Sequence, residues 1–445
     1  MKPAYWKKSV WMSSMKHKYA LIGEKLGHSF SVPIHNAFGN DDYTLTEIPK
    51  EELDAFMQKR EFEGINVTIP YKQAVMPYCI LDEAAKEIGA VNTIVNKGGT
   101  LYGYNTDAYG LNEMMDDATN GDASVFQGKN AVILGAGGTA KTAAYVLRNK
   151  GVKQITVLAR NIEKAKEEMA GKCDSVESIE NLPAQICENA DILVNTTPVG
   201  MYPNVDRKPV ELSDFPSLCA VFDVIYNPLT TDLIAEAKER NLFAANGLYM
   251  LVCQAKKAEE LFAVEGMQMA DSKDVLAGLK KNLTNIVLIG MPGSGKSTVG
   301  KLLAEMTGKE FTDSDVVFEE EFGISPGACI ETNGEEDFRE KEESVIAKLS
   351  SKNQKVLATG GGAVKRTSNR KAMKRNGFVV YLQRDLSALS TQGRPLSMGE
   401  GRLQKLYEER KAIYEGLADL CICVSEGNPE GTAEEILKAY ENTCH

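Results

Sequence analysis

The chain lacks the features that mark membrane, secreted or metal-stapled proteins. No apolar run reaches the roughly 18 residues of a membrane helix, and the opening stretch MKPAYWKKSVWMSSMKHK is too basic and too interrupted for the apolar core of a signal peptide. The nine cysteines are scattered without metal-site spacing, and even Cys421 and Cys423 fall in the alternating pattern CICV of a strand. We therefore expect a cytoplasmic protein with no membrane partner, whose cysteines are reduced core thiols.

Tryptophan is scarce, and blocks of basic residues are missing. Both tryptophans, Trp6 and Trp11, precede the first predicted strand at residues 19–22, so we interpret residues 1–18 as a loose tail, with an ordered docking arm as the alternative. The net charge of −11 spans both halves of the chain, and no Lys/Arg block is interleaved with aromatics, which disfavours a nucleic-acid partner. Anionic small molecules remain possible ligands wherever basic side chains gather locally.

The length and the patterning predict several α/β domains. A chain of 445 residues that is 43% apolar and 25% charged is typical of soluble globular proteins with two to four domains. Short β-rich runs alternate with helical patterns throughout, which predicts parallel sheets. Apolar residues at steps of three and four from Leu248 to Phe262 predict a helix that closes the first half. A polar stretch then yields to the strand IVLIG, so the main boundary should fall near residues 270–284.

A first glycine cluster, GAGGTA, follows a predicted strand and opens a predicted helix that ends at Gly151. Gly135 permits the turn, Gly137 lets a pyrophosphate approach the backbone, and Ala140 allows close packing of the helix. The phosphate would lie at the helix N-terminus, where unpaired N–H groups point outward. A glycine string alone is a weak signal, but this context favours a dinucleotide-binding unit of the Rossmann type over a plain turn.

The end of the next strand indicates which dinucleotide fits. An NAD site has Asp or Glu there, whereas this chain has Arg160, whose guanidinium suits the 2′-phosphate of NADP. The alternative is a solvated surface arginine. We predict NADPH/NADP as the cofactor, and its candidate binding residues are Gly135, Ala136, Gly137, Gly138, Thr139, Ala140, Arg160, Asn161 and Gly247.

Polar clusters gather at the predicted strand ends of the first hundred residues. They are HSFSVPIHN, GINVTIPYK, GAVNTIV and GYNTDAYG, and NTTPVGM, DVIYNPLTT and NGLYMLVCQA follow downstream. In this order the seven motifs resemble the shikimate dehydrogenase family, over residues 19 to about 265. The resemblance implies NADPH-dependent reduction of 3-dehydroshikimate to shikimate, with quinate left open as a slow alternative substrate.

These clusters offer hydroxyls and amides that could bind a polyhydroxylated ring, although each residue taken singly could be a turn or cap residue. The candidates are Ser29, Ser31, Asn66, Thr68, Asn92, Tyr226 and Gln254. Lys72 and Asp107 match the family's catalytic pair, with a surface salt bridge as the plain alternative. Hydride transfer to a ketone leaves an alkoxide, and a lysine ammonium held by a carboxylate can supply its proton.

The chain departs from this family's pattern at two places. Val32 follows Ser31 where the family usually has proline, which here stands one residue later, and Lys25 stands where a proline is common. These changes keep the hydroxyl ligands but alter the local backbone, on which affinity for the ring depends.

A second glycine loop, GMPGSGKS, satisfies the spacing G-x-x-x-x-G-K-[ST] from Gly290 to Ser297, between the strand NIVLI and a helix that ends at Gly308. The loop N–H groups would cradle phosphates, Lys296 would reach the β/γ oxygens, and Ser297 would ligate Mg²⁺. The candidate ATP-binding residues are Gly293, Ser294, Gly295, Lys296, Ser297, Thr298 and Arg394.

Five further motifs follow in the order and spacing of the shikimate kinase family: DSD at 313–315, GEEDFREKE at 334–342, TGGGAV at 359–364, QGRPL at 392–396 and LYEERKAIYEGLAD at 406–419. Residues 285–445 therefore resemble that family. The resemblance implies transfer of the γ-phosphate of ATP to the 3-hydroxyl of shikimate.

The same resemblance implies roles for individual residues. Asp315 would hold the attacking hydroxyl and Asp313 would support Mg²⁺ from its outer shell, with an N-cap or a surface pair as the plain alternative. Arg339 and Arg410 would clamp the shikimate carboxylate, because a planar guanidinium binds a carboxylate through two donors.

The resemblance also implies a glycine run that approaches the substrate ring and a mobile segment that covers the site. Gly360, Gly361 and Gly362 would let the backbone come close to the ring, where a Cβ would clash. Arg394 would come from a mobile lid and stabilise charge on the γ-phosphoryl group, unless it is a simple exposed loop arginine.

The combined motifs predict a bifunctional enzyme that runs two reactions in series on small-molecule substrates, as a monomer or homodimer. In one alternative the C-terminal half is a nucleotide-sensing regulatory domain, but a sensor needs no carboxylate clamp. In the other the first half is an inactive scaffold, which Val32 and Lys25 suggest and the Lys72/Asp107 pair opposes.

The predicted architecture is an α/β substrate domain and a Rossmann dinucleotide-binding domain, followed by a P-loop α/β domain of the nucleoside-monophosphate-kinase type. The predicted bounds are a tail at 1–18, a substrate-binding domain at 19–115 completed by a helix at 247–266, an NADP-binding domain at 116–246, a linker at 267–284 and a kinase domain at 285–445.

Overall fold

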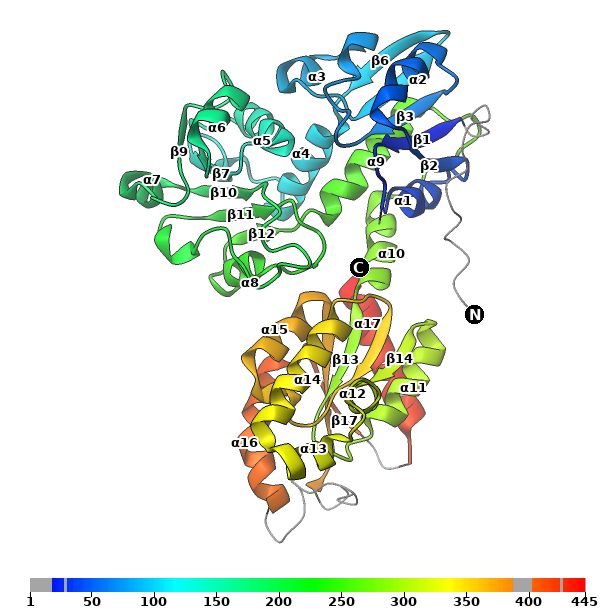
Figure 1. Ribbon diagram of the computed structural model, residues 1–445, viewed down its shortest axis with the longest axis vertical. Helices are drawn as coiled ribbons and strands as arrows, with labels where there is room; N and C mark the ends of the chain where they lie inside the picture. The colour runs from blue at the N-terminus through cyan, green and yellow to red at the C-terminus, as the bar shows by residue number, and fades with distance from the viewer. Residues whose placement is uncertain (1–17, 28–29, 387–401, 425–426, 445) are drawn as a thin grey trace. The chain divides into compact units, whose positions relative to one another are not determined.

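The computed structural model describes residues 18–27, 30–386, 402–424 and 427–444. Residues 1–17 of the tail predicted at 1–18, together with Ser29 and Arg394, lie outside these ranges. The chain divides into two compact units, and along the helix α10 (Ser272–Leu283) the division falls between Leu276 and Ala277. The first unit contains two sheets and the second contains one (Figure 1).

The first sheet has the strand order β2-β1-β3-β5-β6-β4. Its strands are β1 (Tyr19–Gly23), β2 (Tyr43–Glu47), β3 (Gly64–Val67), β4 (Ile80–Leu81), β5 (Thr93–Lys97) and β6 (Thr100–Tyr104). Its helices are α1 (Ser31–Ala37), α2 (Leu53–Lys59), α3 (Glu83–Ile88), α4 (Thr106–Ala118) and, from much later in the chain, α9 (Leu248–Phe262). The predicted closing helix is therefore confirmed.

The prediction of parallel sheets is wrong for β5, which runs antiparallel to both β3 and β6. Gly98 and Gly99 join β5 to β6 with φ values of +59° and +86°, the backbone that a two-residue hairpin turn requires. The signal KGGT was present in the sequence and indicates this hairpin.

The second sheet is wholly parallel, with the order β12-β11-β10-β7-β8-β9 of a Rossmann domain. Its strands are β7 (Asn130–Leu134), β8 (Gln154–Ala159), β9 (Ser175–Ser178), β10 (Ile192–Asn195), β11 (Ala220–Asp223) and β12 (Phe243–Ala245). Its helices are α5 (Gly138–Asn149), α6 (Ile162–Glu168), α7 (Ala184–Asn189) and α8 (Asp232–Glu239).

The third sheet is also parallel, with the order β14-β15-β13-β16-β17. Its strands are β13 (Asn285–Ile289), β14 (Glu310–Asp313), β15 (Lys355–Ala358), β16 (Gly377–Gln383) and β17 (Leu420–Cys423). Its helices are α11 (Lys296–Thr307), α12 (Ser314–Phe322), α13 (Pro326–Asn333), α14 (Glu335–Ser350), α15 (Thr367–Asn376), α16 (Arg402–Leu417) and α17 (Pro429–Cys444).

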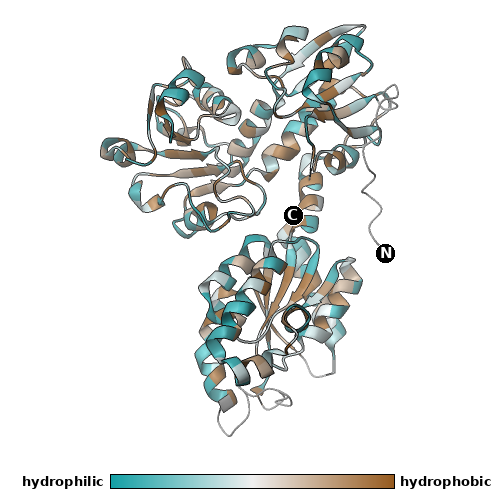
Figure 2. Cartoon of the chain, in the orientation of Figure 1, coloured by the Kyte–Doolittle hydropathy of each residue, from teal (hydrophilic) through white to brown (hydrophobic). Residues whose placement is uncertain are grey.

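The central strands of the two parallel sheets are buried on both faces, which explains their unbroken apolar sequences. In β13, Val287 and Ile289 face one core, and Ile286 and Leu288 face the other. β7 divides in the same way between two cores. Figure 2 shows these strands in brown, with hydrophilic residues concentrated on the surrounding helices.

Two details differ from the sequence-based expectations. All nine cysteines are free, but Cys421 and Cys423 are exposed, so the prediction of core thiols is wrong for them. β17 is an edge strand whose alternation turns Ile422 inward and both thiols outward. The predicted linker is largely the helix α10, whose buried Leu276 and Leu279 stand three residues apart. Within the described ranges, no helix has the length and apolar character to span a membrane.

Candidate active sites

Lys72 and Asp107 meet at the end of the first sheet. Lys72 lies shortly after β3, beyond the cis peptide bond between Ile69 and Pro70, and Asp107 lies in the first turn of α4. The Lys72 Nζ is 2.6 Å from Asp107 Oδ2, and the two side chains are 28% and 20% exposed. Since α4 presents its N-terminus there, the helix dipole also favours the carboxylate. The pair is therefore both engaged and accessible to a ligand.

Asn66 and Asn92 are both buried, and Asn92 contacts Thr106, the residue that precedes Asp107. The Asn92 Oδ1 accepts from the backbone N–H of Thr106 at 2.6 Å, and its Nδ2 donates to Thr106 Oγ1 at 3.0 Å. The Asn66 Nδ2 donates to Thr93 Oγ1 at 2.9 Å. The predicted ligand amides thus also hold one another and the start of α4 in place.

The remaining predicted ligands of the ring come from separate elements. Thr68 is half-buried at the end of β3, and Ser31 begins α1. Tyr226, from the second sheet, packs edge-on against Phe30 with ring centroids 5.9 Å apart. Burial raises the pKa of Tyr226, which keeps its hydroxyl neutral. Tyr226 therefore lies near the start of α1.

Gln254 lies on α9, close to the helix that carries Asp107. A Cβ added at Gly110 on α4 would stand 3.0 Å from the Gln254 Cβ and 2.4 Å from the Met250 carbonyl oxygen. The glycine thus permits the close approach of α4 and α9. All of the described candidates for the first substrate belong to these few neighbouring elements.

The dinucleotide loop has the predicted geometry. Gly135 has a φ of +95°, and a Cβ there would lie 3.0 Å from Thr197 Cγ2. Gly137 and Gly138 face open space, with nothing within 4 Å of an added Cβ. Gly137 is also the N-cap of α5 and offers no side-chain acceptor to the helix N–H groups. Room and donors for a phosphate therefore coincide. Thr197, which touches the loop, was missed by the sequence reasoning although its motif was noted.

The other predicted NADP ligands differ in how far they are exposed to solvent. Arg160 directly follows β8 and is exposed, while Asn161 caps α6 by accepting from the Lys164 N–H at 3.0 Å. Ala140 is fully buried against the sheet, and Ala136 and Thr139 are partly exposed. A Cβ at Gly247 would lie 2.1 Å from the Val224 carbonyl oxygen, so this position requires glycine for packing alone.

The second glycine loop joins β13 to α11. The Lys296 Nζ donates to the carbonyl oxygens of Gly290 and Met291 at 3.0 and 2.9 Å, so the ammonium curls over the loop. Ser294 is buried, whereas Ser297 and Thr298 are exposed beside Gly293 and Gly295. This arrangement places the cation and the hydroxyl on the same short turn.

Ser297 and Asp313, the two predicted metal ligands, contact one another. The Ser297 Oγ donates to Asp313 Oδ2 at 2.7 Å, and Asp313 Oδ1 accepts from the Asp315 backbone N–H at 3.1 Å as the N-cap of α12. An oxygen-only donor set with a carboxylate suits a hard divalent cation such as Mg²⁺. The residues present therefore fit the predicted ion.

Charged side chains converge near the glycine run after β15. Arg339 NH1 contacts Glu342 Oε2 at 2.7 Å, and both are buried. A Cβ at Gly360 would lie 2.9 Å from Asp315 Oδ1, and one at Gly362 would lie 2.3 Å from Arg339 NH2. The glycines thus make room for these charged groups as well as for any ligand. Gly361 packs against Pro292 of the phosphate loop.

The two arginines retain unused donors in this site. The Nε atoms of Arg339 and Arg410 are buried without a hydrogen-bond partner, as is Glu342 Oε1. Unpaired buried donors of this kind are costly, so an anionic ligand would stabilise them. The arrangement fits a carboxylate clamp.

Glu342 is the charged residue of this site that the sequence reasoning missed. Burial raises its pKa, and the nearby Asp315 acts in the same direction, whereas Arg339 opposes the shift. Its spacing of three residues from Arg339 along α14 was the only available signal.

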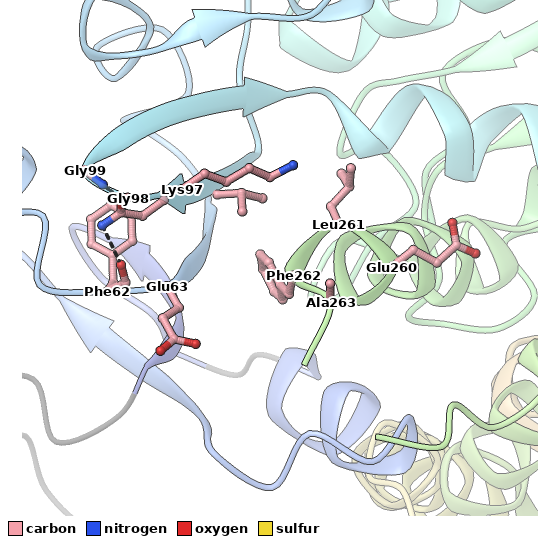
Figure 3. Close-up of a pocket in the computed structure, with 11 residues that line it drawn as sticks. Phe62, Glu63, Lys97, Gly98, Gly99, Glu260, Leu261, Phe262 and Ala263 are labelled. Carbon is pink, nitrogen blue, oxygen red and sulfur yellow. Dashed lines mark hydrogen bonds between the residues drawn. The ribbon is translucent and has the colours of Figure 1, made fainter. Parts of the chain in front are cut away.

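The structure has one cavity away from the Lys72/Asp107 pair and another beside the second glycine loop. A cavity of about 650 Å³ is lined by β5 and the end of α9, including Lys97, Glu63 and Glu260 (Figure 3), and no predicted site residue borders it. We base the first site on the Lys72/Asp107 geometry instead. A cavity of about 360 Å³ includes Ser297, Thr298 and Pro429 in its lining and adjoins the phosphate loop.

Three family models match the chain. The sequence models of the shikimate dehydrogenase substrate binding domain and of shikimate / quinate 5-dehydrogenase match residues 21–94 and 118–224. The shikimate kinase model matches residues 292–441. A shikimate dehydrogenase (NADP⁺) from Clostridium beijerinckii is 41% identical over 255 residues, which cover 55% of this chain and 91% of the relative.

Solved structures extend the comparison. Shikimate 5-dehydrogenase from Thermus thermophilus, in complex with NADP(H) and shikimate, is 30% identical with a TM-score of 0.50, and the match covers 58% of this chain and 97% of that one. Shikimate kinase from Acinetobacter baumannii, in complex with shikimate, is 35% identical and matches 38% of this chain and 98% of its own, with a TM-score of 0.36.

The kinase assignment does not depend on that TM-score, because the family model and the phosphate loop carry it. The chain therefore belongs to the shikimate dehydrogenase family through its first unit, carries a shikimate kinase domain at residues 292–441, and is a bifunctional enzyme of the shikimate pathway.

Proposed function

We propose that the first unit reduces 3-dehydroshikimate to shikimate with NADPH, and that the second phosphorylates the 3-hydroxyl of shikimate with ATP. The observation that carries the proposal is the pairing of Lys72 with Asp107 at 2.6 Å in an accessible site within a shikimate dehydrogenase unit. The oxygen protonated in the first reaction is then the nucleophile of the second.

In the first reaction Lys72 delivers a proton to the oxygen of the reduced ketone. NADPH supplies the hydride when it is bound. Asp107 holds the ammonium in position and stabilises its charge between turnovers. Asn66, Asn92 and Thr68 orient the ring, with Ser29, Ser31, Tyr226 and Gln254 completing the set of ligands. Arg160 binds the 2′-phosphate, which favours NADPH over NADH.

In the second reaction the protein chiefly positions and neutralises charge. Asp315 orients the attacking hydroxyl, and the unpaired donors of Arg339 and Arg410 hold the carboxylate of shikimate. Lys296 moves from its loop carbonyls to the β/γ oxygens, and Arg394 assists from the segment that the described ranges omit. Mg²⁺ at Ser297 and Asp313 would neutralise phosphate charge.

Two assays on the full chain test the proposal. We expect NADPH oxidation with 3-dehydroshikimate, and release of ADP with formation of shikimate 3-phosphate when shikimate and Mg·ATP are supplied. Chelation of Mg²⁺ should stop only the second reaction. Ketone reduction without phosphorylation would favour a nucleotide-sensing domain, and phosphorylation without reduction would favour an inactive first unit.

A further inference from the structure

A buried polar cluster that the reaction does not use lies behind the ring ligands of the first unit. It consists of His35, Asn40, Tyr43 and Glu259, which are between 0% and 2% exposed. His35 belongs to α1, Tyr43 to β2 and Glu259 to α9. The cluster therefore joins elements that are far apart in the sequence, and α1 and α9 each carry a proposed ligand of the ring.

The cluster holds the ring of Tyr43 in one orientation. The His35 Nδ1 bonds to the Glu259 carboxylate, and Asn40 Nδ2 donates to both of its oxygens at 3.0 and 3.1 Å. The imidazole of His35 stacks on the ring of Tyr43, with centroids 3.6 Å apart and planes within 6° of parallel. Because each member is buried and engaged, Tyr43 has little freedom to rotate.

The hydroxyl of Tyr43 connects this cluster to Asn66 through a hydrogen bond. It donates to Asn66 Oδ1 at 2.7 Å. The Asn66 Nδ2 donates to Thr93 Oγ1 at 2.9 Å and to the Asn92 carbonyl oxygen at 3.3 Å. If the Asn66 amide were flipped, its Oδ1 would face the Asn92 carbonyl oxygen, and two acceptors cannot form a hydrogen bond. Both N–H donors are therefore used, and the free capacity of the amide is one lone pair on Oδ1.

We infer that Tyr43 is a positioning residue of the dehydrogenase. Its hydroxyl, held by the buried cluster, fixes the Asn66 amide so that Oδ1 accepts a hydrogen bond from a hydroxyl of the substrate ring. The inference rests on the proposed function of the first unit, and it adds a specific requirement: at this position the substrate must offer a donor. Loss of the Tyr43 hydroxyl removes one of the three hydrogen bonds that hold the Asn66 amide, which loosens Oδ1 and weakens the binding of the ring without touching the cofactor.

Two matched variants of the full chain separate positioning from stability. Tyr43→Phe removes the hydroxyl that bonds to Asn66. Tyr19→Phe removes a hydroxyl from the neighbouring strand, where Tyr19 is the register partner of Tyr43 but forms a part-buried bond to Glu63 Oε2 at 2.9 Å. Both variants lose one tyrosine hydrogen bond in the same sheet, and the loss of stability should be smaller for Tyr19→Phe because its bond is only part-buried.

We expect Tyr43→Phe to raise the KM for 3-dehydroshikimate by roughly five- to thirtyfold, the range for one lost hydrogen bond, with a smaller change in kcat. The KM for NADPH and the rate of shikimate phosphorylation should stay within about twofold. Tyr19→Phe should leave all of these constants within about twofold while lowering the melting temperature by a smaller amount.

Equal changes in both variants, or a Tyr43→Phe variant that loses only thermal stability, would overturn the inference. If Tyr43→Phe does not fold, Thr93→Val takes its place, because Thr93 is another partner of the Asn66 amide. The same selective rise in KM is then required, and its absence overturns the inference. A wild-type protein that does not reduce 3-dehydroshikimate would refute the proposed function itself, which is a separate result.

Discussion

The two glycine loops of this chain are built from the same local structure and are equipped for different chemistry. Each follows the central strand of a parallel sheet and opens a helix of twelve residues. The first loop, residues 135–140, contains no charged side chain, and Lys141, which follows it, is buried and bonded to Glu168. In the second, Lys296 and Ser297 stand on the first turn of the helix itself.

The difference follows from what happens to the phosphate. A dinucleotide keeps its pyrophosphate during hydride transfer, so backbone N–H groups suffice and open glycines are enough. A transferred phosphoryl group develops charge on its oxygens, which calls for a cation and a metal ligand at the same turn. The side chains on the first helical turn, and not the glycines, separate the two functions.

Removal of the kinase cation should give the largest effect. We expect Lys296→Ala to reduce shikimate phosphorylation by about 10³-fold or more, because the β/γ charge loses its fixed partner. Dehydrogenase kcat and KM should stay within about twofold in the same preparation. Lys348→Ala, which removes an exposed lysine paired with Glu321, serves as the control and should keep both activities.

A kinase-dead Lys296→Ala protein that also reduces ketone poorly, with an unchanged circular dichroism spectrum, would break the comparison. The two loops would then be energetically coupled, and the regulatory interpretation of the second unit would return.

The proton donor of the first unit should give the next largest effect. Lys72→Ala is expected to lower the kcat of ketone reduction by about 10²-fold with a smaller change in KM, because the proton is needed chiefly in the transition state. Lys129→Ala breaks another Lys/Asp pair of the same unit, in which Lys129 contacts Asp191 at 3.1 Å, and should leave kcat unchanged. A large rise in KM with intact kcat would make Lys72 a binding residue only.

Cofactor choice gives a smaller effect that sharpens the contrast between the loops. Since the first loop has no cation of its own, Arg160→Ala should raise the KM for NADPH by roughly ten- to a hundredfold and leave NADH use and the KM for ATP nearly unchanged. Steady-state kinetics with both dinucleotides measure this. Arg148→Ala, which removes an exposed arginine paired with Asp174, is the control. Equal losses with both dinucleotides would contradict the role of Arg160.

The smallest expected effect is a difference in pH dependence between the units. Burial lowers the pKa of His35 from its ordinary 6.5, although Glu259 acts in the opposite direction. Below about pH 6.5 the unfolded chain therefore binds a proton that the native state does not, and the first unit loses stability as the pH falls. No histidine occurs between residues 285 and 444, so the described part of the kinase domain lacks this contribution.

Urea-dependent hydrogen exchange at pH 5.5, 6.5 and 7.5 measures this in peptides from α1 and β2, with β13 and β16 as the reference. In the variant His35→Asn the unfolding free energy of the first unit should depend less on pH. The slope should fall by an amount that corresponds to at most about one proton taken up on unfolding. An unchanged slope would mean that His35 is already protonated in the native state.

Local patterns predicted the elements well. Unbroken apolar runs such as NIVLI, followed by glycine turns, predicted both phosphate loops. Apolar residues spaced three and four apart predicted α9. These signals depend only on neighbours in the sequence. The hairpin at Gly98 and Gly99 was not predicted although its local signal, KGGT, was present. The exposure of the two thiols of β17 was not predicted because the position of a strand at the edge depends on the rest of the sheet.

The candidate sites were predictable only in part. The pairing of Lys72 with Asp107 was expected from a family resemblance. The two residues are 35 positions apart in the sequence, and no periodicity of a helix or strand connects positions at that distance. His35 and Glu259 stand 224 residues apart, and neither lies in a pattern that signals the other. Glu342 was hidden among the charges of α14, and only its burial beside Arg339 distinguishes it.

The return of α9 to the first sheet has a consequence for the order of folding during synthesis. Ala258 and Phe262 share an apolar core with Tyr19, Leu21 and Tyr43, and a Cβ on Gly64 would lie 2.3 Å from the Phe262 ring. The domain of the first sheet therefore cannot seal its core until the whole dinucleotide-binding sheet has been translated, whereas every strand of the kinase sheet comes from one uninterrupted stretch. Nascent chains halted before α9 should expose β1 and β2 to proteases and to chaperones.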